Sequence, residues 1–195
     1  AMDTIIISAF PGCGKTYFYR NQSLLGYSVL DLDSGSFKRY SGWEKIYVDS
    51  IVQNMGKYDF ILISQHDNIL YELNERHINF FTVAPDNSKD FTCEQKQLFK
   101  SQWLKRLILR DNTHISNIQL WLKNIDRNYE IWTNAENIQQ YNPIHHFAIS
   151  TNQYLTDIIE DIIKATPHKS HQLGNVHEKH RNQLHSKIKN GIIKV

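Results

Sequence analysis

A glycine-rich segment near the N-terminus contains the residue types that bind phosphate. Residues 9–16 read AFPGCGKT and continue a short β-branched run at 4–9. The full phosphate-loop pattern is Gly, four residues, Gly, Lys, then Ser or Thr, and this chain departs from it only at Ala9. In such a loop, backbone N–H groups turn toward phosphate oxygens at the start of the next helix. The segment therefore predicts a nucleotide-binding loop.

The types of residue in this loop predict a role for each of them. Two glycines give the backbone its freedom, the lysine adds a positive charge for the β and γ phosphates, and the threonine hydroxyl can ligate Mg²⁺. A glycine-rich turn that binds nothing is the alternative, but such turns rarely carry Lys and Thr directly after the second glycine. We therefore expect ATP and Mg²⁺ to be bound by Pro11, Gly12, Cys13, Gly14, Lys15 and Thr16.

Two carboxylates follow the second apolar run, at 27–32. Alternation along a strand would aim Asp31 and Asp33 to the same side, at the sheet edge that carries the phosphate loop. We interpret Asp31 as a magnesium ligand and Asp33 as the group that orients the phosphate acceptor, with Ser34 and Ser36 as further polar contacts. The alternative is that paired aspartates at a strand end form a turn or cap a helix.

Arginines on a later helix could contact the phosphates. Arg106 and Arg110 lie four residues apart in a helical pattern at 93–110, so they share a face that could cover a bound triphosphate as a lid. Their planar guanidinium groups suit phosphate oxygens and the charge that develops during transfer. The alternative is a solvated helix face. On the acceptor side, Arg39 is a weaker candidate, and Trp43 is a candidate for stacking on a base.

The third strand lacks a residue that many P-loop proteins have. Its predicted range, 59–64, ends at Ser64 and Gln65, whereas an aspartate that supports Mg²⁺ commonly stands there. Asp59 is at the opposite end of the strand. The carboxylate for the metal must then come from the aspartates after the second strand. His66 could contact the acceptor, although a histidine in such a loop more often has a structural role.

Apolar runs and helical spacings alternate along the chain. We expect strands at 4–9, 27–32, 59–64, 78–84 and 146–149, and helices at 15–22, 43–55, 68–76, 93–110, 115–132 and about 155–165. This order predicts the α/β class, with a parallel sheet covered by helices on both faces. We expect one domain at 2–165, with a lid-like helical hairpin at about 93–132. Residues 166–195 are basic and rich in histidine, and we predict a flexible tail.

The motifs resemble a known family. FPGCGKT at 10–16 is similar to the FPGxGKS/T loop of small P-loop kinases, especially short phage-encoded nucleotide and adenylate kinase-like proteins of the nucleoside monophosphate kinase type. DLDSGSF at 31–37 is similar to their DSDSSxF motif, and DFILIS at 59–64 and QWLKRLILRDN at 102–112 also look familiar. The resemblance covers about 4–165. It implies a three-layer P-loop kinase fold with a five-stranded parallel sheet and a late helical lid.

Composition sets wider limits. The 195 residues are 41% hydrophobic, which is enough for one well-buried domain. Lys and Arg number 22 and Asp and Glu 20, so the net charge of +2 does not demand a nucleic-acid or membrane partner. No apolar run approaches the length of a membrane span. The two cysteines give no disulfide framework, and we expect a cytoplasmic protein.

The leading hypothesis from sequence is an ATP- and Mg²⁺-dependent phosphotransferase that acts on a nucleoside monophosphate or a similar small acceptor. One alternative is a kinase that acts on a polynucleotide end or a modified DNA base, with the basic tail holding the strand. Another is a regulatory protein that binds nucleotide without transferring phosphate, which the missing third-strand aspartate favours slightly.

Overall fold

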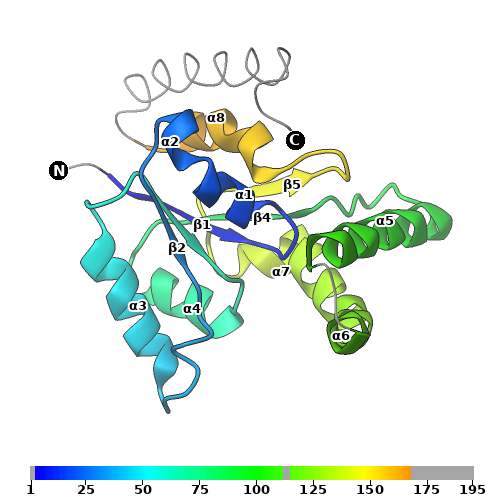
Figure 1. Cartoon of the computed structure of the whole chain (residues 1–195), viewed down its shortest axis with the longest axis horizontal. Helices are drawn as coiled ribbons and strands as arrows, with labels where there is room; N and C mark the ends of the chain where they lie inside the picture. Colours follow the sequence, from blue (N-terminus) through cyan, green and yellow to red (C-terminus); the bar gives the residue numbers. More distant parts are fainter. Residues whose placement is uncertain (1–2, 112–114, 168–195) are drawn as a thin grey trace.

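The computed structural model describes residues 3–111 and 115–167 (Figure 1). The predicted tail at 166–195 therefore lies almost entirely outside the described residues. No helix in the described ranges is long and apolar enough to cross a membrane.

A five-stranded parallel sheet forms the centre of the molecule. The strand order is β2-β3-β1-β4-β5, so β1 lies in the middle with a partner on each side. A strand buried on both faces reads as a continuous apolar run, which is how β1 was predicted. The α/β class and the five-stranded parallel sheet are confirmed. The strands are β1 Ile5–Ala9, β2 Val29–Leu32, β3 Phe60–Ile63, β4 Phe81–Pro85 and β5 His146–Ile149.

Helices cover both faces of the sheet, which gives three layers (Figure 1). Helices α1, α2 and α8 lie above the sheet in this view, and α3 and α4 lie below it. Helix α8 buries five aliphatic residues, which form its apolar stripe. These helices span Lys15–Arg20 (α1), Gln22–Leu25 (α2), Trp43–Asn54 (α3), Asp67–Glu75 (α4) and Leu155–Ala165 (α8).

A helical hairpin lies beyond the ends of the central strands (Figure 1). It consists of α5, Cys93–Asp111, and α6, Ile115–Thr133, close to the predicted ranges. A short helix, α7, follows at Ala135–Gln139. From the sequence we expected no element between 132 and 146, where a polar loop ends at Pro143, and that expectation is wrong. The Asn134 side chain caps α7 by accepting hydrogen bonds from two backbone N–H groups, and Ile138 is fully buried.

Strands β2 and β4 begin two and three residues later than predicted, because local hydrogen bonds hold the preceding residues. The Tyr27 N–H donates to the Gln22 carbonyl at 3.0 Å, so β2 begins at Val29 rather than at Tyr27. The Ile78 N–H donates to the Leu73 carbonyl at 2.9 Å, which ends α4 in a turn and delays β4 to Phe81. Apolar periodicity does not distinguish such turns from the strand that follows.

The register of the sheet brings the ends of three strands to one level. Ser8 of β1 pairs with Ile63 of β3, and Ile63 pairs with Leu32 of β2. The next residue along each strand direction is Ala9, Ser64 and Asp33, respectively. The start of the phosphate loop, the end of β3 and the second carboxylate therefore meet at the same edge of the sheet.

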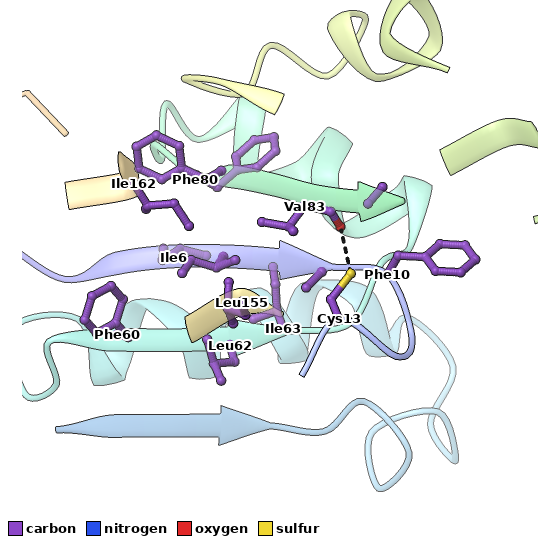
Figure 2. Close-up of a cluster of buried hydrophobic side chains, with 14 of the residues drawn as sticks. Ile6, Phe10, Cys13, Phe60, Leu62, Ile63, Phe80, Val83, Leu155 and Ile162 are labelled. Carbon is purple, nitrogen blue, oxygen red and sulfur yellow. Dashed lines mark hydrogen bonds between the residues drawn. The ribbon is translucent and has the colours of Figure 1, made fainter. Parts of the chain in front are cut away.

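Buried side chains connect this edge to α8 (Figure 2). Leu62 and Ile63 of β3 and Leu155 of α8 belong to one buried cluster, and Cys13, in the loop after β1, donates its thiol hydrogen to the Val83 carbonyl at 3.8 Å. All of these side chains are fully buried. The loop is thus continuous with the hydrophobic core.

The central strands should carry much of the stability. Leu62 has no exposed surface, so Leu62→Ala should lower the free energy of unfolding by about 2 to 5 kcal/mol, through lost burial and the cavity left behind. Leu109 is 71% exposed, and the same substitution there should change stability by less than about 0.5 kcal/mol. Urea unfolding followed by circular dichroism measures both, and equal losses would contradict this assignment of the core.

Candidate functional site

The predicted phosphate loop lies between β1 and α1. Gly12 and Gly14 have φ angles of 88° and 97°, in the left-handed region that glycine adopts without strain. Helix α1 begins at Lys15, with no acidic residue in its first turn. The loop therefore ends at a helix N-terminus whose partial positive charge favours an anion.

The missing first glycine has a structural explanation. Ala9 is fully buried and belongs to β1, where it pairs with Val83. The following N–H, that of Phe10, also donates to the Val83 carbonyl, at 2.8 Å. The chain is thus still extended at the first motif position, so no positive φ is needed there, and alanine is compatible with it.

Helix α5 packs directly on the loop. The Trp103 indole N–H donates to the Pro11 carbonyl at 3.0 Å, and both Trp103 and Leu107 are fully buried. A Cβ atom placed on Gly12 would lie 2.8 Å from Leu107 Cδ2. Gly12 thus serves the close approach of the hairpin as well as the turn of the loop.

Arg106 packs against Trp103, next to the contact between α5 and the loop. Its guanidinium carbon is 4.5 Å from the ring centroid of Trp103 and 3.6 Å from that of Tyr154, and Nη2 donates to the Gln153 carbonyl. Nε and Nη1 are buried, with no hydrogen-bond partner among the described residues. Tyr154 Cδ1 is 3.1 Å from where a Cβ on Gly14 would stand, so this cation lies beside the loop. The side chain of Arg110, the second predicted arginine, lies outside the described residues.

Three loop residues have different environments. The Lys15 side chain extends toward β3, where Nζ donates to the Ile63 carbonyl at 3.5 Å. Thr16 is exposed. Burial raises the pKa of the Cys13 thiol to about 12, although the positive charges of Arg106 and Lys15 act to lower it. Cys13 is therefore a neutral, packed thiol rather than a reactive one.

The two carboxylates after β2 differ in exposure. Asp33 is exposed, and its Oδ1 accepts a hydrogen bond from the Gly35 N–H at 3.1 Å. Asp31 is half-buried, and burial raises its pKa; the positive charge of Lys15 lowers this pKa, while the negative charge of Asp33 raises it further. Each of these groups therefore lies within electrostatic reach of Asp31.

These residues fit a magnesium ion better than a metal held by protein alone. The described part of the chain has no group of three or more histidine, cysteine, aspartate or glutamate residues that could hold a metal. Mg²⁺ usually takes one or two protein oxygens together with waters and substrate phosphates. A cation near Asp31 would also favour the ionised form that burial disfavours. Thr16 and Asp31 are the oxygen donors that could hold such an ion.

A cleft of about 340 Å³ opens beside the loop. Its apolar wall includes two residues of α6, Ile125 and Trp132, so the hairpin forms part of the cleft and not only a cover over the loop. The polar residues that line it are Lys15, Asp33, Ser34, Lys38, Ser64, Gln65, His66 and Asn128. The cleft therefore joins the phosphate loop to the carboxylate side of the site.

A cluster of ring side chains supports the polar wall. The buried Ser34 hydroxyl lies 3.0 Å from Nε2 of His66, and the His66 ring meets Trp43 edge-on with 5.3 Å between centroids. Tyr47 packs against Trp43 and donates to the Leu32 carbonyl at 2.6 Å. Burial, with a further contribution from the charges of Lys38 and Lys15, lowers the pKa of His66 to about 4. His66 is neutral at pH 7.

The predicted acceptor residues divide into two groups. Asp33 and Ser34 line the cleft, whereas Ser36 and Arg39 are exposed and are not among its lining residues. Trp43 lies behind His66 and is not among them either.

Lys38 lines the cleft but was not predicted. Its N–H donates to the Ser34 carbonyl at 3.2 Å, which is one helical turn, and residues four apart in such a turn share a side. The spacing from Ser34 was therefore a signal that favoured Lys38 over Arg39.

Gln65 stands where many P-loop proteins have a carboxylate. Its Nε2 donates to the Val83 carbonyl at 3.3 Å, and this contact fixes the orientation of the amide. The other atom, Oε1, is buried with no hydrogen-bond partner among the described residues. The β3 end thus supplies a neutral amide to the cleft rather than a charge.

Comparisons with known proteins give a distant structural similarity and no sequence match. No protein-family model matches the sequence, and no curated protein sequence matches it significantly. One similar solved structure is shikimate kinase from Bacteroides thetaiotaomicron, with 12% identity over 97% of this chain and 99% of that chain, and a TM-score of 0.43. A likeness of this degree does not identify a reaction, so the function must be inferred from the residues themselves.

The neutral His66 should make stability depend on pH. In the unfolded chain His66 protonates near 6.5, but in the folded protein only near 4, so between these values the unfolded state binds more protons. Stability should therefore fall as the pH decreases from about 6.5 toward 4. His146 has a pKa lowered to about 4 by burial and should act in the same direction.

Urea unfolding at several pH values tests this dependence. His66→Asn keeps a hydrogen-bonding group near Ser34 and should reduce the slope, as should His146→Asn, with the effects of the two variants adding. An NMR titration of the imidazole protons gives the pKa values directly. A His66 midpoint near 6.5 would contradict the burial argument.

Proposed function

We propose that this protein is an ATP-dependent phosphotransferase and that its acceptor is a nucleoside monophosphate. One observation carries the proposal: Lys15 of the phosphate loop and Asp33 line the same cleft. A donor phosphate held at the loop would then face an acceptor held on the carboxylate side. Bringing two reactants together in this way contributes much of the rate of phosphoryl transfer.

The chemical step needs little from the protein beyond positioning and charge. An acceptor oxygen forms a bond to the γ phosphorus while the bond from that phosphorus to the β–γ bridging oxygen breaks, and ADP leaves with the electron pair. A phosphate monoester is largely ionised at pH 7, because its second pKa is near 6. Its oxygen is therefore already a nucleophile, so transfer needs no strong general base to activate the acceptor.

The residues of the site would divide the work. Lys15 and the loop N–H groups would bind the donor phosphates, and Arg106 would add a second positive charge beside them. Asp33 would orient the acceptor. Thr16 and Asp31 would hold a magnesium ion, which when bound neutralises charge on the donor phosphates.

The cleft supports a nucleotide-sized acceptor. Its volume of about 340 Å³ is at the lower end of the range for small-molecule sites, roughly 300 to 1,000 Å³. Phe10, Ile125 and Trp132 give it an apolar part that could face a base, while most of its other lining residues are polar. Such a division suits a molecule with one planar apolar part and one charged part.

A second candidate function is nucleotide binding without transfer. The amide of Gln65 in place of a carboxylate favours it, because the metal then depends on Asp31, which is half-buried. The third candidate, a kinase for polynucleotide ends, depends on a tail that lies almost entirely outside the described residues.

Acceptor-dependent formation of ADP from ATP tests the proposal across a panel of nucleoside monophosphates. Lys15→Ala should lower kcat/KM by at least about 100-fold through lost phosphate binding. Asp33→Asn should lower kcat by about 100-fold with a small effect on the KM for ATP, because it removes acceptor positioning. Lys45→Gln is the control: this exposed lysine lies on α3, is not among the cleft-lining residues and should leave the rate unchanged.

Tight ATP binding by the wild-type protein, with no acceptor-dependent ADP formation for any member of the panel, would support the non-catalytic alternative instead.

A further inference from the structure

Lys38 gives the cleft a second cation, separate from the phosphate loop. We propose that Lys38 binds the phosphate of the acceptor and thereby selects phosphorylated acceptors over neutral ones. This inference rests on the proposed function, because it takes the cleft to be the acceptor site.

The charges that line the cleft support this role. Among its lining residues the lysines are Lys15 and Lys38 and the carboxylate is that of Asp33. Once a donor triphosphate occupies Lys15, Lys38 is the remaining lysine of the cleft wall. The donor phosphates and Asp33 both repel an acceptor that carries negative charge. A cation at the position of Lys38 would offset this repulsion.

Lys38 is exposed, but two contacts restrict its position. Its ammonium lies 5.8 Å from the ring centroid of Trp43, within the range of a cation–π interaction. The ring of Trp43 is in turn fixed by edge contacts with His66 and Tyr47, whose centroids lie 5.3 and 6.0 Å away. The backbone of Lys38 is anchored to Ser34 by the turn described above. A partly ordered lysine loses less conformational entropy when it binds an anion.

The positive charges of Lys38 and Lys15 both act on His66. Both Lys38 and Lys15 lower its pKa, so both positive charges lie close enough to its ring to be felt there. His66 itself remains neutral at pH 7 and shares its Nε2 with the Ser34 hydroxyl at 3.0 Å. It therefore adds no competing charge, and the cationic end of the acceptor cleft is made by lysine.

Asp33 is the group that opposes this assignment, because it lines the same cleft. Its Oδ1 accepts from the Gly35 N–H, which binds the carboxylate into its own turn. Asp33 is also exposed, where water weakens its repulsion of an anion. Lys38 is exposed as well, so water weakens both interactions, and the preference for an anion depends on the acceptor phosphate lying nearer to the ammonium than to the carboxylate.

Equilibrium binding with the donor site filled by a non-hydrolysable ATP analogue and Mg²⁺ separates this inference from catalysis. Isothermal titration calorimetry would compare AMP, GMP, CMP, UMP and dTMP with the corresponding nucleosides, for the wild-type protein and for Lys38→Gln. The variant should bind the preferred monophosphate at least about tenfold more weakly, through loss of one charge-assisted contact, and should bind its nucleoside unchanged. Lys38→Arg should retain most of the affinity. Lys45→Gln, with the same loss of charge on α3, should bind like the wild type.

The outcomes distinguish two failures. If the wild-type protein binds nucleosides as tightly as monophosphates, or binds neither, or if Lys38→Gln leaves the monophosphate affinity unchanged, the role of Lys38 is wrong. Phosphate transfer to a neutral hydroxyl acceptor, unaffected by Lys38→Gln, would leave phosphate transfer from ATP standing and overturn both the role of Lys38 and the nucleoside monophosphate as acceptor. Lys38-dependent monophosphate binding with no phosphate transfer would support this inference while contradicting the proposed function.

Discussion

The site depends on how the phosphate loop is held in place from three sides. The loop continues from β1, its Cys13 carbonyl accepts from the Leu155 N–H at the start of α8 at 2.7 Å, and its Pro11 carbonyl accepts from Trp103 of α5. Its glycines adopt backbone angles that other residues rarely reach, which leaves the loop short and tightly turned. Such a loop is pre-organised, because the surrounding core fixes the direction of its N–H groups before any anion arrives.

The hairpin connects the two halves of the site physically. Helix α5 packs on the loop through Trp103 and Leu107, while α6 supplies Ile125 and Trp132 to the wall of the cleft. The two helices contact each other along the hairpin. A displacement of α5 from the loop would therefore also alter the shape of the acceptor side. Occupancy of the loop and of the cleft should thus be energetically coupled, since both depend on the position of the same packed element.

The sequence predicted the parts of the molecule that depend on regular periodicity. The run at 4–9, the glycine spacing of the loop and the apolar stripes of the hairpin each required only local patterns, and β1, the loop and the two long helices lie where expected. Short elements were harder to predict. Helix α7 depends on the Asn134 cap and on the burial of one isoleucine, Ile138. It has no apolar stripe from which periodicity could predict it. Which cation lies near the acceptor depends on the turn that follows Ser34. Lys38, four residues after Ser34, lines the cleft, whereas the next residue, Arg39, does not.

Asp31 illustrates what sequence alone could not supply. Alternation along β2 predicted that it shares a side with Asp33, and the register of the sheet shows that Asp31 pairs with Leu62, one residue before the strand end, whereas Asp33 follows the strand. At that depth the carboxylate loses water and its pKa rises, while Lys15 from the loop acts in the opposite direction. Whether Asp31 stays ionised depends on the balance between burial, which disfavours its negative charge, and the positive charge of Lys15 in the phosphate loop. That balance is a property of the assembled sheet edge, and it links the ionisation of Asp31 to whatever charge the loop holds.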